Sequence, residues 1–494
     1  MRRRLAFAAL ALGPILLGVP AAAQDTLEDT ILERLERLEA ENARLRERIE
    51  DLEDQERLET PVNSPASSAG REDKTGLANL IGTNAAYSVA MLDHAEGTTV
   101  KPLTQLMATS DGDLSQHVTL SGGVTVLADW QTSNLPNSFG YLMRHPTINN
   151  QVGDHVSEAV IHSAQLAITA RLSDDFTGYF ELLYDPEQSF GSGTITALAR
   201  NQVQLRRGWV MWGNLAERPV YALIGKLDVP FGLNDTVSPF TQSTSYHAFA
   251  GLAYGAQAGY FDGNLHLRAM AVQGGAQFRA ANAPVNGTSV PSRLNNFALD
   301  ASYRLTWDQA DSLLLGASYL HGSAYCQEYP VVHFSPCNER VPAWAAYGRL
   351  RLGHITLLGD YATTTRVWPG SAVPDPANPL STFAARETEA FTLGGRYGFG
   401  PLVGIAGQYR WALSAEFSRL NAGADGSPWE KQDQWVAGLS YYPATGINLF
   451  AEYVHVDGFV PLNFLSGGNL PDGATWSSQE ANSEVVLVGA QVNF

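Results

Sequence analysis

The chain has 494 residues, a formal net charge of −18 and only two cysteines. The acidic excess argues against a nucleic-acid partner, because proteins that bind nucleic acids present basic patches to the phosphates. Beyond the N-terminus, no stretch reaches the ~20 apolar residues that a membrane-spanning helix needs.

The first residues have the pattern of a secretory signal. Arginines at positions 2–4 precede an apolar stretch over 5–19, and three alanines at 21–23 form a small-residue cleavage site. We therefore predict a signal peptide over 1–23 and an exported mature protein.

Residues 24–59 are predicted to form a coiled coil in the periplasm. The segment 25–59 holds fourteen acids and six arginines (6 − 14 = −8), and its g-to-e′ pairs join opposite charges in a parallel self-association. Asn42 at an a position favours a dimer, whereas the barrel predicted behind it favours the homotrimer that we expect. A charged helix without a partner is the alternative. The predicted oligomerisation residues are Ile31, Leu35, Leu38, Asn42, Leu45, Ile49 and Leu52.

Residues 60–116 are the part of the chain that the sequence defines least. A polar linker rich in proline and serine covers 60–75. Residues 76–116 contain a short apolar patch but no clear period, and they are compatible with a lining of the periplasmic mouth or with a small plug.

From residue 117 the hydrophobic period is two, as in strands with one apolar face. The last strand places its apolar face on Val486, Val488, Ala490, Val492 and Phe494, and the chain ends on that aromatic. A terminal Phe494 resembles the signal that the barrel assembly machinery of bacterial outer membranes reads. We predict an all-β fold for 117–494, a 16-stranded antiparallel transmembrane β-barrel preceded by the helical coiled coil.

The lengths of the connections support this count of strands. Seven short turns alternate with eight long loops, and an even number of strands returns both ends to one side. The turns are expected near 173–175, 213–219, 262–264, 306–311, 352–354, 398–401 and 443–446. The loops are expected near 131–156, 186–200, 233–250, 274–294, 322–341, 367–384, 415–430 and 458–480.

Aromatic residues at strand ends are typical of the girdles where a barrel meets the membrane interfaces. A soluble β-sandwich or propeller, the alternative, would need polar outer faces. The pattern therefore indicates the outer membrane of a Gram-negative bacterium, with lipid and lipopolysaccharide as partners. The outward aromatics are expected to be Trp130, Tyr184, Trp209, Tyr303, Trp344, Tyr409 and Trp411.

Strand parity also predicts which charges line the pore. Ten bases and seven acids fall on the polar face, so the lumen is mixed and mildly cationic, and its field would orient and screen polar solutes. The alternative is that these charges only pair across strands and hold the barrel's shape. Arg206 and Arg207 cannot both face the lumen without a bulge. The predicted lining is Asp129, Arg171, Glu181, Asp185, Arg206, Lys226, Asp228, Arg268, Asp300, Arg304, Arg349, Arg351, Asp360, Arg366, Arg396, Arg410 and Glu452.

Little in the sequence points to chemistry. Cys326 and Cys337 lie in one loop of an exported chain, which predicts a disulfide, and two cysteines alone do not complete a zinc shell. His162 and Ser163 are adjacent, so on a regular strand they point to opposite faces and cannot form a nucleophile–base pair. We expect no enzyme activity, no cofactor and no metal site.

Two local motifs carry a resemblance. GKLDVPFG (225–232) leaves a strand for a long loop, and GLAYGAQAGYFDGNLHLRAMAVQGG (251–275) forms a hairpin around Asp262, Gly263 and Asn264. With the signal peptide, coiled coil and barrel, the chain resembles LbtU-type siderophore porins and DcaP-type trimeric porins. The resemblance implies transport of an iron-chelating small molecule and transfers no ligand residue. Phosphate-selective porins share the barrel type, but this chain has only Lys74, Lys101, Lys226 and Lys431.

The sequence thus predicts a diffusion porin for small hydrophilic solutes, with a siderophore or another anionic or zwitterionic metabolite as the expected cargo. TonB-gated receptors are disfavoured, because residues 76–116 are too few for their globular plug. One alternative is a structural anchor tethered to the cell wall through the coiled coil. Another is an adhesin or phage receptor that acts through the long loops.

Overall fold

The computed structural model describes residues 80–114, 116–136, 138–139, 153–185, 202–273, 294–308, 311–326, 339–369, 383–404, 408–460 and 477–494. The predicted signal peptide, the coiled coil and its oligomerisation positions lie outside these residues.

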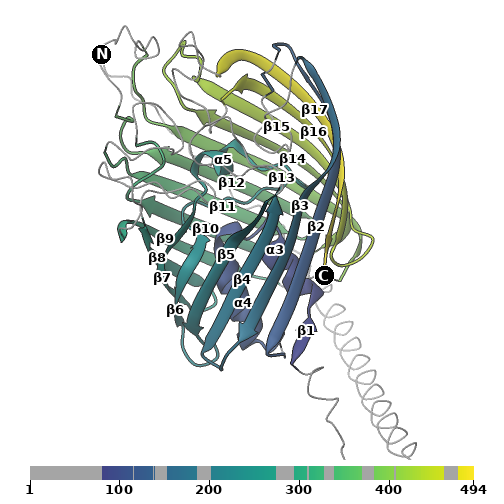
Figure 1. The fold of residues 1–494 in the computed structure, drawn as a ribbon, viewed down its shortest axis with the longest axis vertical. Helices are drawn as coiled ribbons and strands as arrows, with labels where there is room; N and C mark the ends of the chain where they lie inside the picture. Colours follow the sequence, from purple (N-terminus) through teal and green to yellow (C-terminus); the bar gives the residue numbers. More distant parts are fainter. Residues whose placement is uncertain are drawn as a thin grey trace, which may run out of the picture. The chain divides into compact units, whose positions relative to one another are not determined.

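Within the described residues, sixteen antiparallel strands form a closed barrel, which confirms the predicted fold of this region (Figure 1). Each strand pairs with its neighbours in the chain, and the last pairs with β2. The strands are β2 (Val118–Ser133), β3 (His155–Arg171), β4 (Phe176–Asp185), β5 (Gln202–Gly213), β6 (Val220–Asp228), β7 (Leu252–Phe261), β8 (Leu265–Gln273), β9 (Leu294–Thr306), β10 (Ser312–Leu320), β11 (Ala343–Leu352), β12 (Ile355–Thr364), β13 (Glu389–Leu402), β14 (Tyr409–Asn421), β15 (Lys431–Tyr441), β16 (Ile447–Phe459) and β17 (Ser478–Asn493).

Short turns and long loops alternate along this meander, and the sixth turn differs from its expected place. β13 continues through 398–401 with a register shift between Phe399 and Leu402, and the chain turns only after it. Gly400 adopts φ +83° there, a left-handed conformation that glycine accepts without strain. Glycine in this strand therefore marks a bulge, which sequence reading took for a turn. The loop expected from 415 begins later as well, because β14 runs to Asn421.

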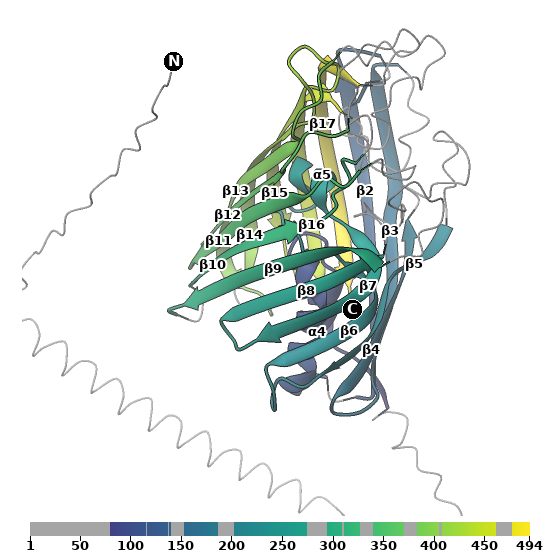
Figure 2. The same ribbon diagram turned by 90° about the vertical axis from the view of Figure 1, so that its left-hand side faces the viewer.

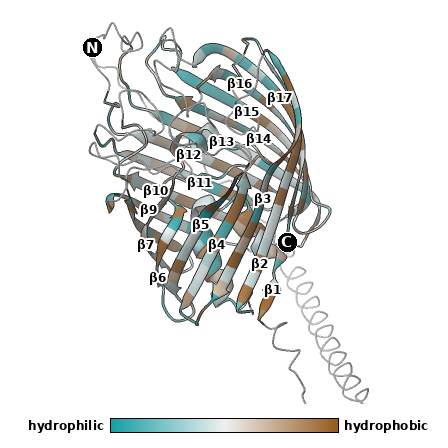
Figure 3. Ribbon diagram, viewed as in Figure 1, coloured by the Kyte–Doolittle hydropathy of each residue, from teal (hydrophilic) through white to brown (hydrophobic). Residues whose placement is uncertain are grey.

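Hydrophobic and hydrophilic residues alternate along the strands (Figure 3), and the exposed positions of the wall are largely apolar. On β17, for example, Val486 and Val488 are 48% and 44% exposed, whereas Val485 and Leu487 are fully buried on the lumenal side. Among the described helices, none combines the length and the apolar character needed to cross a membrane.

Trp209 does not belong to this outer face, although parity placed it there. It is 4% exposed, stacks on Tyr179 at 4.5 Å between ring centroids, and donates its indole N–H to Gln105 at 2.9 Å. A register shift between Glu181 and Leu182 inverts the phase of β5, so a residue counted as outward before the shift is inward after it.

β1 (Ile81–Thr83) pairs with the start of β2 at one end of the barrel. The helices that follow it lie inside the lumen (Figure 2). They are α3 (Ala85–Leu92), the short 3-10 helix η1 (Thr98–Val100) and α4 (Lys101–Ser110). α3 begins where the Asn84 side chain accepts the amide of Tyr87, and α4 has a proline in its first turn. Hydrogen bonds to inward residues of β2 to β5 fix the two helices: Tyr87 to Thr169 (2.7 Å), Ser88 to Ser121 (2.8 Å) and Gln105 to Thr177 (2.9 Å).

A second segment enters the lumen between β6 and β7. Residues 229–251 form a long loop with the short helix α5 (Thr244–Phe249), and nearly all of it is buried. α5 packs against β12 to β15 across the barrel interior. The lumen therefore holds two inserted segments, one at the short-turn end and one from a long loop.

The C-terminal aromatic packs on a glycine of the first barrel strand. The backbones of Phe494 and Gly122 exchange two hydrogen bonds of 2.9 Å, and a Cβ at Gly122 would lie 2.3 Å from the Phe494 ring. We expect Gly122→Val to lower the yield of folded barrel, because the ring would have to leave its position on β2. The measurement is the fraction of heat-modifiable protein on gels. Gly359→Val is the matched control, since a Cβ there meets ordinary contacts of 3.5 Å and beyond; equal yields for both variants would contradict the prediction.

Candidate functional site

The two inserted segments contact each other in the middle of the lumen. The amide of Thr236 donates to the carbonyl of Ala95 at 2.8 Å, and the hydroxyl of Thr98 donates to the carbonyl of Asn234 at 3.0 Å. The amide of Thr98 also donates to the Asp235 carboxylate at 3.2 Å. Segment 80–114 and loop 229–251 therefore form one packed body inside the barrel, and any solute path must pass beside it.

Three carboxylates of the barrel wall hold loop 229–251 by its backbone. Glu452 accepts the amides of Phe240 (2.6 Å) and Thr241 (3.1 Å). Asp360 accepts two more amides, those of Leu233 at 3.1 Å and Asn234 at 3.2 Å. The third is Glu416, which accepts the amide of Val237 at 3.1 Å and the hydroxyl of Thr236 at 2.7 Å. Since a carboxylate only accepts hydrogen bonds, these acids position the loop and satisfy its buried amides.

A buried network of opposite charges lies on β4, β5 and β6. Arg207 donates to Asp228 at 2.6 Å and to Glu181 at 3.2 Å, and all three side chains are largely buried. Arg206 lies 3.6 Å from Glu181 as well, because the register shift after Glu181 leaves Arg206 as the extra residue of a bulge. The bulge thus allows two adjacent arginines to approach one carboxylate.

A second buried pair joins β8 to β9. Arg268 donates to Asp300 at 2.7 Å, and both side chains are at most 2% exposed. Asp300 also accepts the hydroxyls of Ser318 and Tyr347, each at 2.7 Å. Arg268 in addition donates to the carbonyl of Thr99, so the pair attaches the wall to the N-terminal segment. Every charge here has partners, which marks a structural role.

The remaining arginines of the β9–β13 wall form a cluster of four, Arg304, Arg349, Arg351 and Arg396, which we call the arginine cluster. Arg304 and Arg349 are both register partners of Leu314 on β10. Arg351 and Arg396 are both partners of Thr356 on β12. The four side chains therefore occupy neighbouring rows on the lumenal face of one wall.

Two acids from the inserted segments face this arginine cluster. Glu96, on the turn after α3, lies 2.6 Å from Arg351 and 2.5 Å from Arg396. Asp235 of the loop lies 2.7 Å from Arg349. Burial alone would raise the pKa of Glu96, but Arg351, Arg396 and Arg349 together hold that pKa well below its usual range. Glu96 is thus ionised at neutral pH.

The arginine cluster keeps a positive excess after these pairings. Four arginines face Glu96 and Asp235, so the sum is 4 − 2 = +2. Within the described residues, the side chain of Arg304 has no hydrogen bond or ion pair, and that of Arg351 is 39% exposed. This wall is the part of the lumen where an anion can find unsatisfied cationic groups.

The other predicted pore residues are distributed around the barrel. Asp129 is fully buried and accepts the Gln131 amide at 3.2 Å. Arg171, at the end of β3, donates to the carbonyl of Leu114 at 3.4 Å. Arg410 is partly buried on β14, and the side chain of Asp185 lies outside the described part of the chain.

Lys226 lies buried in the wall, and Arg366 lies beyond the end of its strand. Lys226 is the register partner of Tyr254, an exposed ring of the outer face, and its ammonium lies 5.8 Å from that ring and donates to the carbonyl of Leu205. Lys226 itself is only 5% exposed, so it lies buried within the wall. Arg366 follows the end of β12 at Thr364 and donates to the carbonyl of Arg340 in the loop region.

The disulfide prediction can be followed on one cysteine only. Cys326 is fully buried and disulfide-bonded, and its expected partner Cys337 lies outside the described residues. His162, the neighbour of Ser163, is the extra residue of a bulge on β3 and packs edge-on against Phe240 at 4.8 Å.

Comparisons with known proteins add the following. No family model matches the chain. A UPF0422 protein of Coxiella burnetii is 25% identical over 198 residues, and the match spans 38% of this chain and 38% of that protein.

Three solved structures are among those similar to this chain. The channel DcaP of Acinetobacter baumannii is 15% identical with a TM-score of 0.46, and the match covers 76% of this chain and 97% of that one. An anion-selective porin from Comamonas acidovorans is 12% identical with a TM-score of 0.47, over 76% and 99%. OmpF of Salmonella typhi is 11% identical with a TM-score of 0.44, over 76% and 97%.

Proposed function

We propose that the protein is an outer-membrane porin that passes small hydrophilic solutes and prefers anions. Two features of the barrel support this proposal. Its closed wall carries an apolar outer face, which suits lipid, and a polar charged lumenal face, which suits water. The single observation that carries the anion preference is the arginine cluster, with its net charge of +2 beside the inserted segments.

The expected cargo is an anionic or zwitterionic metabolite, with a siderophore as one candidate. Carboxylates and related oxyanions accept arginine N–H groups such as those that Arg351 and Arg396 each donate to one oxygen of Glu96. The lumenal carboxylates of Asp360, Glu416 and Glu452 are occupied by backbone amides, so they oppose an anion less than their number suggests.

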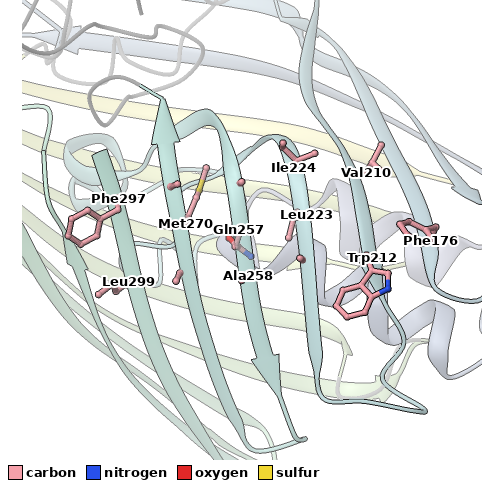
Figure 4. A pocket seen from close by; sticks show the side chains of 14 residues that line it. Phe176, Val210, Trp212, Leu223, Ile224, Gln257, Ala258, Met270, Phe297 and Leu299 are labelled. Carbon is pink, nitrogen blue, oxygen red and sulfur yellow. The ribbon is translucent and has the colours of Figure 1, made fainter. Parts of the chain in front are cut away.

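A homotrimer in the outer membrane is part of the same proposal. The outer face of β4 to β9 carries a groove of about 740 Å³, shown in Figure 4, and its lining includes several alanines together with Phe176, Trp212 and Phe297. Small outward residues let a second wall approach closely, which favours self-association on this face. Periplasmic placement of the coiled coil, contact with lipopolysaccharide and recognition of Phe494 by the assembly machinery complete the proposal.

The alternatives are a structural anchor and a loop-mediated adhesin or receptor. A third possibility, an enzyme, finds no support at His162, whose ring packs on Phe240. The anchor and the adhesin require no ion current, whereas the porin does.

The test is the current carried by purified protein in planar bilayers. We expect stepwise conductance and a reversal potential in a potassium chloride gradient that indicates preference for chloride. Arg351→Ala should lower the anion-to-cation permeability ratio roughly two- to threefold, as expected for one exposed charge at a water-filled constriction. Arg366→Ala removes the same charge outside the strands and should leave the ratio unchanged. Absence of current from folded protein would refute the porin proposal in favour of the anchor.

A further inference from the structure

Glu96 is bound by the barrel wall as a ligand would be. Its two carboxylate oxygens take separate arginines, with Oε2 2.6 Å from Arg351 and Oε1 2.5 Å from Arg396, and Arg349 follows at 3.8 Å. These three arginines come from β11 and β13, whereas Glu96 belongs to the segment that precedes the barrel. The arrangement matches the way arginines recognise a carboxylate on a bound molecule.

Glu96 also attaches segment 80–114 to the barrel wall through ion pairs. Among the described residues, it is the only side chain of this segment that forms an ion pair with the wall. The turn behind it is rigid, because the ammonium of Lys101 donates to the carbonyls of Ala90, Asp93 and Glu96 at 2.7, 2.7 and 3.2 Å. The position of the carboxylate is therefore coupled to the position of the two helices.

The attachments of the segment differ between the two sides of the barrel. On the β2–β5 side, neutral hydrogen bonds of Tyr87, Ser88 and Gln105 fix the helices to the wall. On the β11–β13 side, the direct ion pairs of the segment with the wall are those of Glu96, and Thr98 reaches Arg349 only through Asp235 of the loop. An anion that competes for the arginines would thus weaken one side only.

The arginine cluster has the capacity for such a competitor. It retains a charge of +2, Arg351 is 39% exposed, and Arg304 has no counter-ion within the described part of the chain. A solute with several carboxylates brings more negative charge than Glu96 alone and can bind Arg304 as well. The exchange therefore becomes favourable for a multivalent anion, whereas a neutral solute gains nothing from it.

We propose that Glu96 is an internal stand-in for an anionic solute, and that a multivalent carboxylate displaces it from Arg351 and Arg396 and so releases segment 80–114 from the β11–β13 wall. This inference rests on the proposed porin function and adds a gate that responds to the solute. The arginine cluster then binds the solute in the open state and Glu96 in the closed state.

The test uses a reporter cysteine at position 95, next to Glu96. Ala95 is 7% exposed, so Ala95→Cys should react slowly with a polar thiol reagent, and Cys326 does not interfere because it is disulfide-bonded. Citrate should accelerate labelling of A95C roughly tenfold, since two charge-assisted hydrogen bonds of Glu96 are exchanged. Sodium chloride at equal ionic strength and glycerol at equal osmolarity should not, which separates occupancy of the site from screening.

Substitution of Glu96 gives the decisive comparison. In A95C/E96Q, labelling should be fast without citrate and should no longer respond to it. Asp111→Asn removes one charge from the same segment at an exposed position, and A95C/D111N should behave like A95C. Arg396→Ala, which removes a partner on the wall, should also speed labelling and provides a second route if E96Q folds poorly.

The outcomes separate this inference from the porin proposal. If the barrel conducts ions but labelling ignores both citrate and E96Q, the gate is refuted and the porin remains. If no variant carries current while E96Q still releases the segment, the porin proposal fails instead. Equal effects of citrate and sodium chloride would also overturn the inference, because screening alone would then account for release.

Discussion

Replacing Glu452 with alanine is expected to loosen the Phe240–Thr241 part of loop 229–251 and to raise the single-channel conductance. The Glu452 side chain is buried and holds the amides of Phe240 and Thr241, which would lose their partners in the lumen. Charge-assisted hydrogen bonds of this kind contribute about 1.5–3 kcal/mol each, so loss of both should free the Phe240–Thr241 part of the loop from the β16 wall. The conductance of single channels in planar bilayers measures the result.

The control for this variant is Glu480→Ala, which removes the same charge from an exposed position of β17. Its conductance should equal that of the unmodified protein. The double variant E416A/E452A should exceed E452A, because Glu416 holds the neighbouring amide of Val237. If E452A conducts like E480A, the carboxylate does not position the loop.

Replacing Arg268 with alanine should destabilise the barrel more than any change at an exposed ion pair. Asp300 would remain fully buried without its cationic partner, which costs about 3–5 kcal/mol in comparable cases. The expected result is a clear drop in the temperature at which heat-modifiable migration on gels is lost. Arg218→Ala, whose partner Asp175 is 37% exposed, should change stability by about 0–1 kcal/mol.

Removing both partners tests the cause of this effect. R268A/D300A should be more stable than R268A, since the stranded carboxylate is then absent. A double variant no more stable than R268A would show that lost packing, including the contact of Arg268 with Thr99, causes the defect.

Much of the barrel could be predicted from the sequence because its period of two is a local property. Strands such as β17 alternate buried and exposed residues along their length, so the pattern directly reports the wall. Errors arose where a bulge breaks the period. The shift after Glu181 turned Trp209 inward, and Gly400 gave a bulge where a turn was expected.

The centre of the candidate site could not be predicted from the sequence for another reason. Glu96 and Asp235 lie in segments without a period, and only the three-dimensional path of these segments brings them to Arg349, Arg351 and Arg396. Glu416 was missed because it was assigned to a loop that begins later. Strand parity predicts the lumenal arginines of the wall, but it carries no information about which other segments of the chain enter the lumen and contact them.

The first barrel strand is shared by two partners where the barrel closes. β1 pairs in parallel with residues 118–120 of β2, and β17 pairs in antiparallel fashion with residues 123–133. The backbone bonds between Gly122 and Phe494 fill the interval between them. Within the described residues, β1, Phe494 and β17 thus divide this edge of β2 between them, so the edge is occupied by the chain itself and not offered to a strand of another chain.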